Sequence, residues 1–138
     1  MNKKDKYIYS AIFEPAEEGG YCITFPDLPG CITEGDTLAE SLSMAKEALE
    51  LHLYSFEEDN EEIPEPTAPE KIKAQNGSFI VPIEAFMPLI REEMANKSVK
   101  TTVTMPQWLK KLGEEKKVNF SLILQTALKQ HLGIKDNK

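Results

Sequence analysis

Short segments of alternating apolar and polar residues occupy the first third of the chain, and this period of two predicts β-strands. The expected strands cover residues 7–13, 21–25, 31–34 and, further along, 78–83. Glycine, proline and acidic residues separate the first three, as turns require. The last segment contains Pro82, which has no backbone N–H, so we expect this strand to lie at a sheet edge or to end there.

After Gly35 the apolar period changes to between three and four, which predicts one long helix. Thr37 and Glu40 have the spacing of a capping box, in which each side chain bonds a free backbone N–H at the helix start. His52 lies on the flank of this helix and is interpreted as a packing residue rather than a metal ligand. The apolar stripe expected to pack on the sheet consists of Leu38, Leu42, Ala45, Leu49, Leu53 and Phe56.

After this helix the composition of the chain changes twice, and the predicted structure changes with it. Residues 57–77 are acidic and rich in proline, which predicts an irregular, extended connection, and a short helix is expected over 84–95. The tail then predicts a strand over 99–105 and helices over 107–115 and 119–132. Residues suited to begin or end the tail helices are Pro106, Asn119 and Gly133.

Net charge also separates the first part of the chain from the tail, with the change near residue 96. The 138 residues carry a net charge of −7, but residues 1–96 hold 20 acidic and 7 basic side chains, whereas 97–138 hold 3 acidic side chains and 9 lysines. The acidic side chains of residues 1–96 repel nucleic acid, which is also negatively charged. The basic tail is therefore the part expected to meet a polyanion. We therefore expect two domains, 1–95 and 96–138.

A strand and two helices in about 40 residues bury too little apolar surface to fold alone. We therefore expect a homodimer through residues 99–132, in which two copies of the strand pair into an antiparallel ribbon. Side chains on the outer face of that ribbon would reach base edges in the DNA major groove: Lys100, Thr102 and Thr104. The second helix would hold a phosphate at its first residues, Asn119, Phe120 and Ser121. The shared core would consist of Trp108, Leu109, Leu112, Phe120, Leu124, Ala127 and Leu128.

The stretch from Lys100 to Pro106, with the helix start at 119–121, resembles the ribbon-helix-helix fold of bacterial repressors. The absence of arginine from this ribbon predicts weak guanine reading at Lys100, because only arginine offers a rigid bidentate fork. A dimerisation arm that does not bind DNA is the alternative interpretation.

The run from Phe25 to Thr37, followed by Ala45 to Leu49, resembles the hallmark of HicB antitoxins. This resemblance implies an α+β protein, in which a partial RNase H-like domain (three strands, helix, fourth strand) precedes a ribbon-helix-helix dimerisation domain. It also implies an antitoxin that binds and neutralises a HicA-type mRNA-cleaving ribonuclease toxin and represses its own operon. Acidic residues that would steer the basic toxin are Glu14, Glu17, Glu18, Glu57, Glu58 and Asp59. Alternatively, these acids only keep a loop and a connection solvated.

The acidic residues and cysteines of the sequence give little indication of a catalytic site. Asp27 and Asp36 lie in turns, and Cys22 and Cys31 have no base nearby and are interpreted as small core thiols. We expect no enzyme, no cofactor and no metal; a metal-dependent nuclease is a rival. A second rival is a stand-alone ribbon-helix-helix repressor with a ligand-sensing first domain. The chain has no apolar run of roughly 18 residues and no signal-peptide pattern, so a cytoplasmic location without membrane contact is expected.

Overall fold

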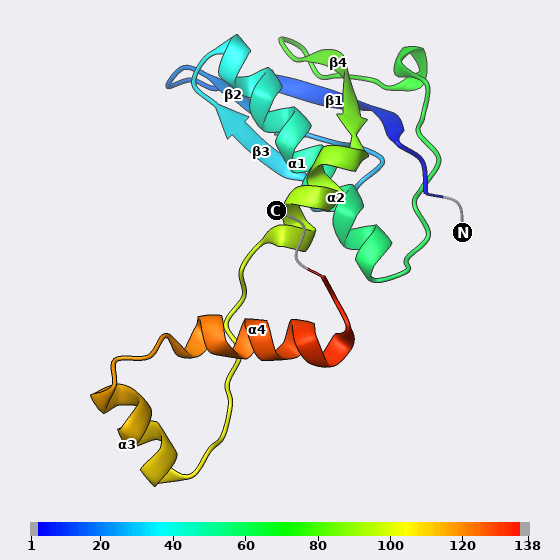
Figure 1. Ribbon diagram of the computed structural model, residues 1–138. Coiled ribbons are helices and arrows are strands. Elements are labelled where there is room, and N and C mark those ends of the chain that lie inside the picture. Colours follow the sequence, from blue (N-terminus) through cyan, green and yellow to red (C-terminus); the bar gives the residue numbers. More distant parts are fainter. Residues whose placement is uncertain (1–2, 136–138) are drawn as a thin grey trace. The chain divides into compact units, whose positions relative to one another are not determined.

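The computed structural model describes residues 3–135, which form two compact units that divide between Lys97 and Ser98 (Figure 1). We call the unit before this point the body and the unit after it the tail. The division lies two residues after the boundary expected from charge and composition. The two units are described separately below.

The body is a four-stranded antiparallel sheet with one long helix on it (Figure 1). Its strands are β1 (Lys6–Pro15), β2 (Tyr21–Thr24), β3 (Ile32–Gly35) and β4 (Phe79–Phe86). Their order in the sheet is β3-β2-β1-β4, so β3 and β4 are the edges. The helix α1 (Leu38–Glu58) packs against β2, β3 and β4. The expected order of three strands, a helix and a fourth strand at an edge is confirmed.

The core lies between α1 and one face of the sheet. Its fully buried side chains include Tyr9, Phe13, Ile23, Leu28, Leu49, Leu53 and Met87. At the start of α1 the predicted stripe is wrong, because Leu38 and Leu42 are 47% and 39% exposed while Ser41 is buried. The reason is a close approach to β3: a Cβ at Gly35 would lie 2.5 Å from the Ser41 Oγ. Because the Ser41 Cα and N would also lie 2.7 Å from such a Cβ, only glycine at position 35 lets the helix pack so near the strand.

The boundaries of the helices follow local hydrogen bonding. Thr37 caps α1 as expected, since its Oγ1 accepts a hydrogen bond from the Glu40 N–H at 3.1 Å. The second helix, α2, covers Met87–Asn96 and begins three residues later than predicted, because β4 continues as a strand to Phe86. Proline in the first turn of α2 suits this late start.

In the tail, the two predicted helices are confirmed as α3 (Gln107–Glu115) and α4 (Phe120–Leu132). The Asn119 Oδ1 accepts from the Leu122 N–H at 3.0 Å, and Gly133 ends α4 with a φ of +72°. In the single chain residues 99–105 form no ladder, and the strand expected there, which was to pair with a second copy, stays a prediction. A strand requires a hydrogen-bonding partner, and one copy of the tail supplies none.

The connection from α1 to β4 is irregular, as expected, with a single 3₁₀ turn at Pro69–Lys71. It is nevertheless held at two points, one on β1 and one in the turn between β2 and β3. The Tyr9 hydroxyl donates to the Pro64 carbonyl, and the Asp27 carboxylate accepts from Thr67 N–H at 2.8 Å and Thr67 O–H at 2.6 Å. Asp27 thus orders the connection, a role that its position in a turn did not predict.

A second anchor joins α2 to the end of α1. The Arg91 guanidinium makes a bidentate pair with the Glu57 carboxylate, with Nε–Oε1 and Nη2–Oε2 distances of 3.0 and 2.8 Å. It also donates to the Lys4 carbonyl at 2.6 Å and to the Asp5 carboxylate at 3.2 Å. The hydrogen bond with Glu57 raises the pKa of Arg91, so the cation persists at all ordinary pH values. One side chain therefore ties together α1, α2 and the segment before β1.

We expect Arg91→Ala to lower the free energy of unfolding by about 2 kcal/mol, because it leaves the Glu57 carboxylate buried without its cation. Urea unfolding followed by circular dichroism measures this change. The control is Glu61→Ala, which removes an exposed acid of the connection and is expected to change stability by less than about 0.5 kcal/mol. Equal stabilities of the Arg91 variant and the wild type would contradict the anchoring role.

Candidate functional site

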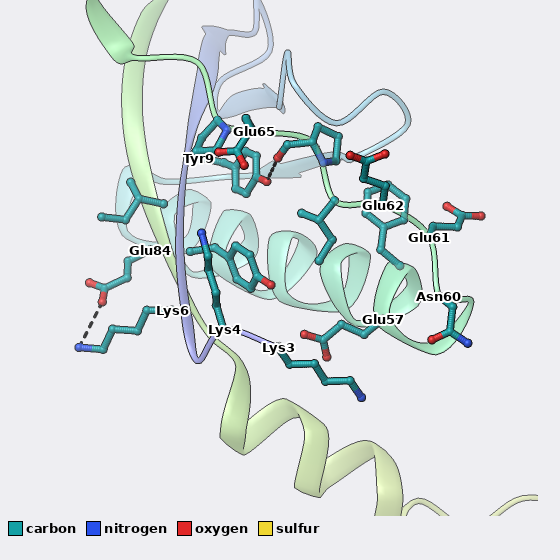
Figure 2. Close-up of a pocket in the computed structure, with 16 residues that line it drawn as sticks. Lys3, Lys4, Lys6, Tyr9, Glu57, Asn60, Glu61, Glu62, Glu65 and Glu84 are labelled. Atoms are coloured by element: carbon teal, nitrogen blue, oxygen red, sulfur yellow. Dashed lines mark hydrogen bonds and ion pairs between the residues drawn. The ribbon is translucent and has the colours of Figure 1, made fainter. Parts of the chain in front are cut away.

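A groove of about 540 Å³ runs along the first half of β1 (Figure 2). It exists because β1 pairs with β4 from Lys6 onward but with β2 only from Ile12 onward. The residues of β1 before Ile12 therefore lack a strand on that side, and the connection passes there instead. Figure 2 shows Tyr9 reaching the Pro64 carbonyl across one end of the groove.

The walls of the groove carry opposite charges. Lys3, Lys4 and Lys6 line it from the chain start and β1, and the connection contributes Glu61, Glu62 and Glu65 (Figure 2). Burial, with a smaller contribution from nearby Tyr7, raises the pKa of Tyr9 to about 12, so its hydroxyl remains a donor. The lining also includes Glu57 and Glu84, so three lysines face five glutamates, and the charge of this groove does not select an anion. Among residues 3–135, no group of three or more His, Cys, Asp and Glu side chains is placed to hold a metal ion.

The acids predicted to steer a toxin fall into two separate groups. Glu14 is exposed near the end of β1, Glu17 and Glu18 are exposed in the hairpin turn that follows, and Glu58 and Asp59 are exposed at the end of α1. The hairpin lies at the other end of α1, since Tyr21 pairs with Gly35, which packs on Ser41. A helix of 21 residues is about 30 Å long. The structure therefore does not bring the two groups into one patch.

Glu57 does not belong to the exposed acidic surface. Its side chain is only 4% exposed and is engaged by Arg91. The prediction that it faces a partner is corrected for this physical reason. The neighbouring Glu58 keeps its exposure and a side-chain hydrogen bond with Tyr54, which raises the pKa of that tyrosine.

The two cysteines differ in environment. Cys31 is buried, its thiol donates to the Ala48 carbonyl with an Sγ–O distance of 3.6 Å, and burial raises its pKa to about 11. Cys22 is exposed, so its predicted place in the core is wrong. It lies on the sheet face away from α1, because neighbouring Ile23 faces the core.

His52 flanks the core stripe, as expected. Its ring packs edge-on against Phe56 with centroids 4.9 Å apart, and its buried Nε2 has no hydrogen-bond partner in the described residues. With Cys31, Ile32 and Leu51 it lines a shallow depression of about 250 Å³ between α1 and the start of β3. This depression lies beside the edge of the sheet.

The tail exposes the residues predicted to contact DNA. Lys100, Thr102 and Thr104 are exposed, and Asn119, Phe120 and Ser121 are exposed at the start of α4. The predicted core side chains are exposed as well: Trp108 (66%), Leu109, Leu112, Phe120, Leu124, Ala127 and Leu128. In one copy, packing is limited to contacts such as that between Gly113 and the Phe120 ring, where an added Cβ would lie 2.7 Å from the ring.

The sequence pattern predicted no role for three side chains that make long-range hydrogen bonds in the body: Lys46, Glu50 and Arg91. The pair Lys46 and Glu50 has the i, i+4 spacing of a helical ion pair, which is the only local signal for it. Arg91 is the single arginine of the chain, which is a weak signal because nothing in the sequence indicates its partner. In the part of the chain that the structure describes, no helix is both long and apolar enough to cross a membrane.

The chain matches the family model described as HicB_like antitoxin of bacterial toxin-antitoxin system over residues 9–121. It is 30% identical over 108 residues to Antitoxin HicB of Escherichia coli K12, covering 78% of this chain and 74% of that protein. It is 50% identical over 58 residues to Antitoxin HicB 1 of Photorhabdus laumondii, an alignment that spans 42% of this chain and only 37% of that protein.

Solved structures share the fold. A chain of a toxin-antitoxin complex from Streptococcus pneumoniae superposes with a TM-score of 0.59 at 24% identity, over 91% of this chain and 99% of that one. The antitoxin HicB of Burkholderia pseudomallei gives a TM-score of 0.50 at 20% identity, over 88% and 96%. The family match extends from the first strand of the body into the last helix of the tail. The chain therefore belongs to the HicB-like antitoxins of bacterial toxin-antitoxin systems.

Proposed function

We propose that this antitoxin binds and neutralises a HicA-type mRNA-cleaving ribonuclease toxin through its body, and represses its own operon through its tail. The observation that carries this proposal is the family match, which includes most of both units. In this view the body is a partial RNase H-like domain and the tail a ribbon-helix-helix domain. The protein acts by binding, in the cytoplasm, without catalysis and without a cofactor.

Charge supports toxin binding by the body. Its 20 acidic side chains give it a strongly negative field, and a protein that acts on RNA must present a basic surface. The exposed acids Glu14, Glu17, Glu18, Glu58 and Asp59 can accelerate the encounter. Because they lie at two ends of α1, they act on the association rate rather than as one contact patch.

Co-expression tests the toxin arm of the proposal. The small reading frame next to the gene, expressed alone, is expected to stop growth and degrade mRNA, and co-expression of this chain is expected to restore growth. Copurification of the two proteins gives the complex directly. Growth arrest that persists with soluble, folded antitoxin present would contradict neutralisation.

The tail has the charge and the exposed side chains of a DNA-binding unit. It holds 9 lysines against 3 acids, and residues 99–105 belong to no helix or strand in one copy. Two copies of this segment would satisfy each other's backbone groups and present Lys100, Thr102 and Thr104 on the outer face. The α4 N-terminus, with Asn119, Phe120 and Ser121, would hold a phosphate on each side.

We expect Lys100→Ala and Thr102→Ala each to weaken binding to the operator DNA by about 1–3 kcal/mol, because each removes a base contact. Toxin neutralisation is expected to persist, since the body is unchanged. Mobility-shift titrations with the upstream DNA measure the first effect, and the growth assay measures the second. Val99→Ala is the matched control on the same segment. Wild-type operator affinity in both variants would refute the ribbon.

Dimerisation follows from the exposed apolar face of α3 and α4. A lone tail leaves Trp108, Leu112 and Leu124 in water, and a second copy would bury them. Sedimentation equilibrium of the full chain is therefore expected to show a homodimer, and Leu124→Glu is expected to yield monomers. Leu122→Glu is the control, because Leu122 lies on the opposite side of α4. A monomeric wild type at micromolar concentration would contradict the shared core.

A further inference from the structure

The two edge strands of the body sheet differ in whether other groups occupy their outward backbone N–H and C=O groups. On β4 the Phe86 N–H donates to the Glu50 carboxylate at 2.8 Å, and the Glu84 carbonyl accepts from the Lys46 ammonium at 3.3 Å. Lys46 and Glu50 also pair with each other at 2.8 Å, and Pro82 has no N–H. Side chains and a proline thus occupy the outer edge of β4 between Pro82 and Phe86, which leaves little backbone for another strand to pair with.

The direction of the backbone groups on β3 follows from the register. The Met87 N–H donates to the Asp5 carbonyl at 2.8 Å, so odd-numbered residues form the hydrogen-bonded pairs between β1 and β4. Alternate residues of an antiparallel ladder point to opposite sides, so even-numbered residues of β1 bond β2, and odd-numbered residues of β2 bond β3. The bond from Phe25 N–H to the Cys31 carbonyl at 3.3 Å fits this alternation.

The outer edge of β3 is open. Thr33 and Gly35 face β2, so Ile32 and Glu34 direct their N–H and C=O groups away from the sheet. Within residues 3–135 no strand or side chain pairs with these groups. Apolar side chains lie on both sides of the edge: Ile32, 63% exposed, projects from the face away from α1, and Leu51, 38% exposed, lies on α1.

Acidic side chains surround this open edge. Glu34 is exposed on β3, and Glu47 and Glu58 are exposed on the α1 face that carries Leu51, four residues before it and seven after it. A second copy docked here about a two-fold axis would bring identical acids together, which is unfavourable. A strand from a basic protein would instead meet complementary charge.

We propose that the outer edge of β3 is a docking edge for an extended strand of a basic protein, which adds to the sheet at Ile32 and Glu34. Identifying that protein with the toxin rests on the proposed function. Backbone bonds would supply affinity, while Ile32 and Leu51 would contact alternate side chains of the incoming strand. The two groups of exposed acids would then steer the encounter, and the edge would hold the complex.

Amide hydrogen exchange of the full chain, with and without a catalytically inactive toxin, tests this directly. The Ile32 and Glu34 amides are expected to exchange freely alone and to slow at least tenfold in the complex. A complex in which both amides still exchange freely overturns the docking edge and leaves the proposed function intact. Protection that appears without toxin and rises with protein concentration overturns it in favour of a second copy. A failure to form any complex overturns the proposed function itself.

Substitutions at one position separate backbone pairing from charge. Glu34→Pro removes only an outward N–H and keeps the bonds to β2, so it is expected to weaken toxin binding at least tenfold. Glu34→Ala keeps the N–H and is expected to weaken it less than threefold, and Pro82→Ala at the other edge is expected to have no effect. Ile32→Lys is the second variant, used if Glu34→Pro lowers the melting temperature. It leaves the backbone intact and is expected to weaken toxin binding at least tenfold, because the added lysine repels a basic strand. Equal affinities for all four variants overturn the proposal.

Discussion

The need of every strand for a partner for its backbone N–H and C=O groups governs both units of this protein. In the body, the four strands pair with one another and leave two edge strands, β3 and β4, while the first half of β1 lacks a strand on the β2 side. One edge is occupied by Pro82 and by the Lys46 and Glu50 side chains, and the other is open at β3. In the tail, the segment over 99–105 has β-forming residues but no strand partner among the described residues, so it forms no ladder. The same constraint thus leaves backbone groups without a strand partner in both units.

Apolar burial and charge follow the same division. The body buries its own core between α1 and the sheet, with Leu49 and Leu53 against Tyr9 and Phe13. The tail cannot do so, because its two short helices expose most of their large apolar side chains. The acidic body and the basic tail therefore differ: the body buries its own core, whereas the tail leaves its apolar side chains exposed in a single copy.

Long-range contacts make the body rigid around these surfaces. Arg91 connects α1, α2 and the segment before β1, while Asp27 and Tyr9 hold the connection that follows α1. These contacts explain why a proline-rich, acidic stretch is ordered without a core of its own. They also remove Glu57 from the acidic surface, since its carboxylate is buried and engaged by Arg91 and is not available to a partner.

The sequence alone determined the order of strands and helices, the caps at Thr37 and Asn119, the left-handed end at Gly133 and the family, because periodicity, capping and turn chemistry act over a few residues. It did not determine which strand edge is open, where Leu42 and Cys22 lie, or which acid is engaged by Arg91. Those depend on which residues meet across the sheet after folding, and residues 34 positions apart, as Glu57 and Arg91 are, carry no local sign of their contact. The length of β4 was likewise a tertiary outcome, since its last residues, up to Phe86, pair with the start of β1 at Lys6.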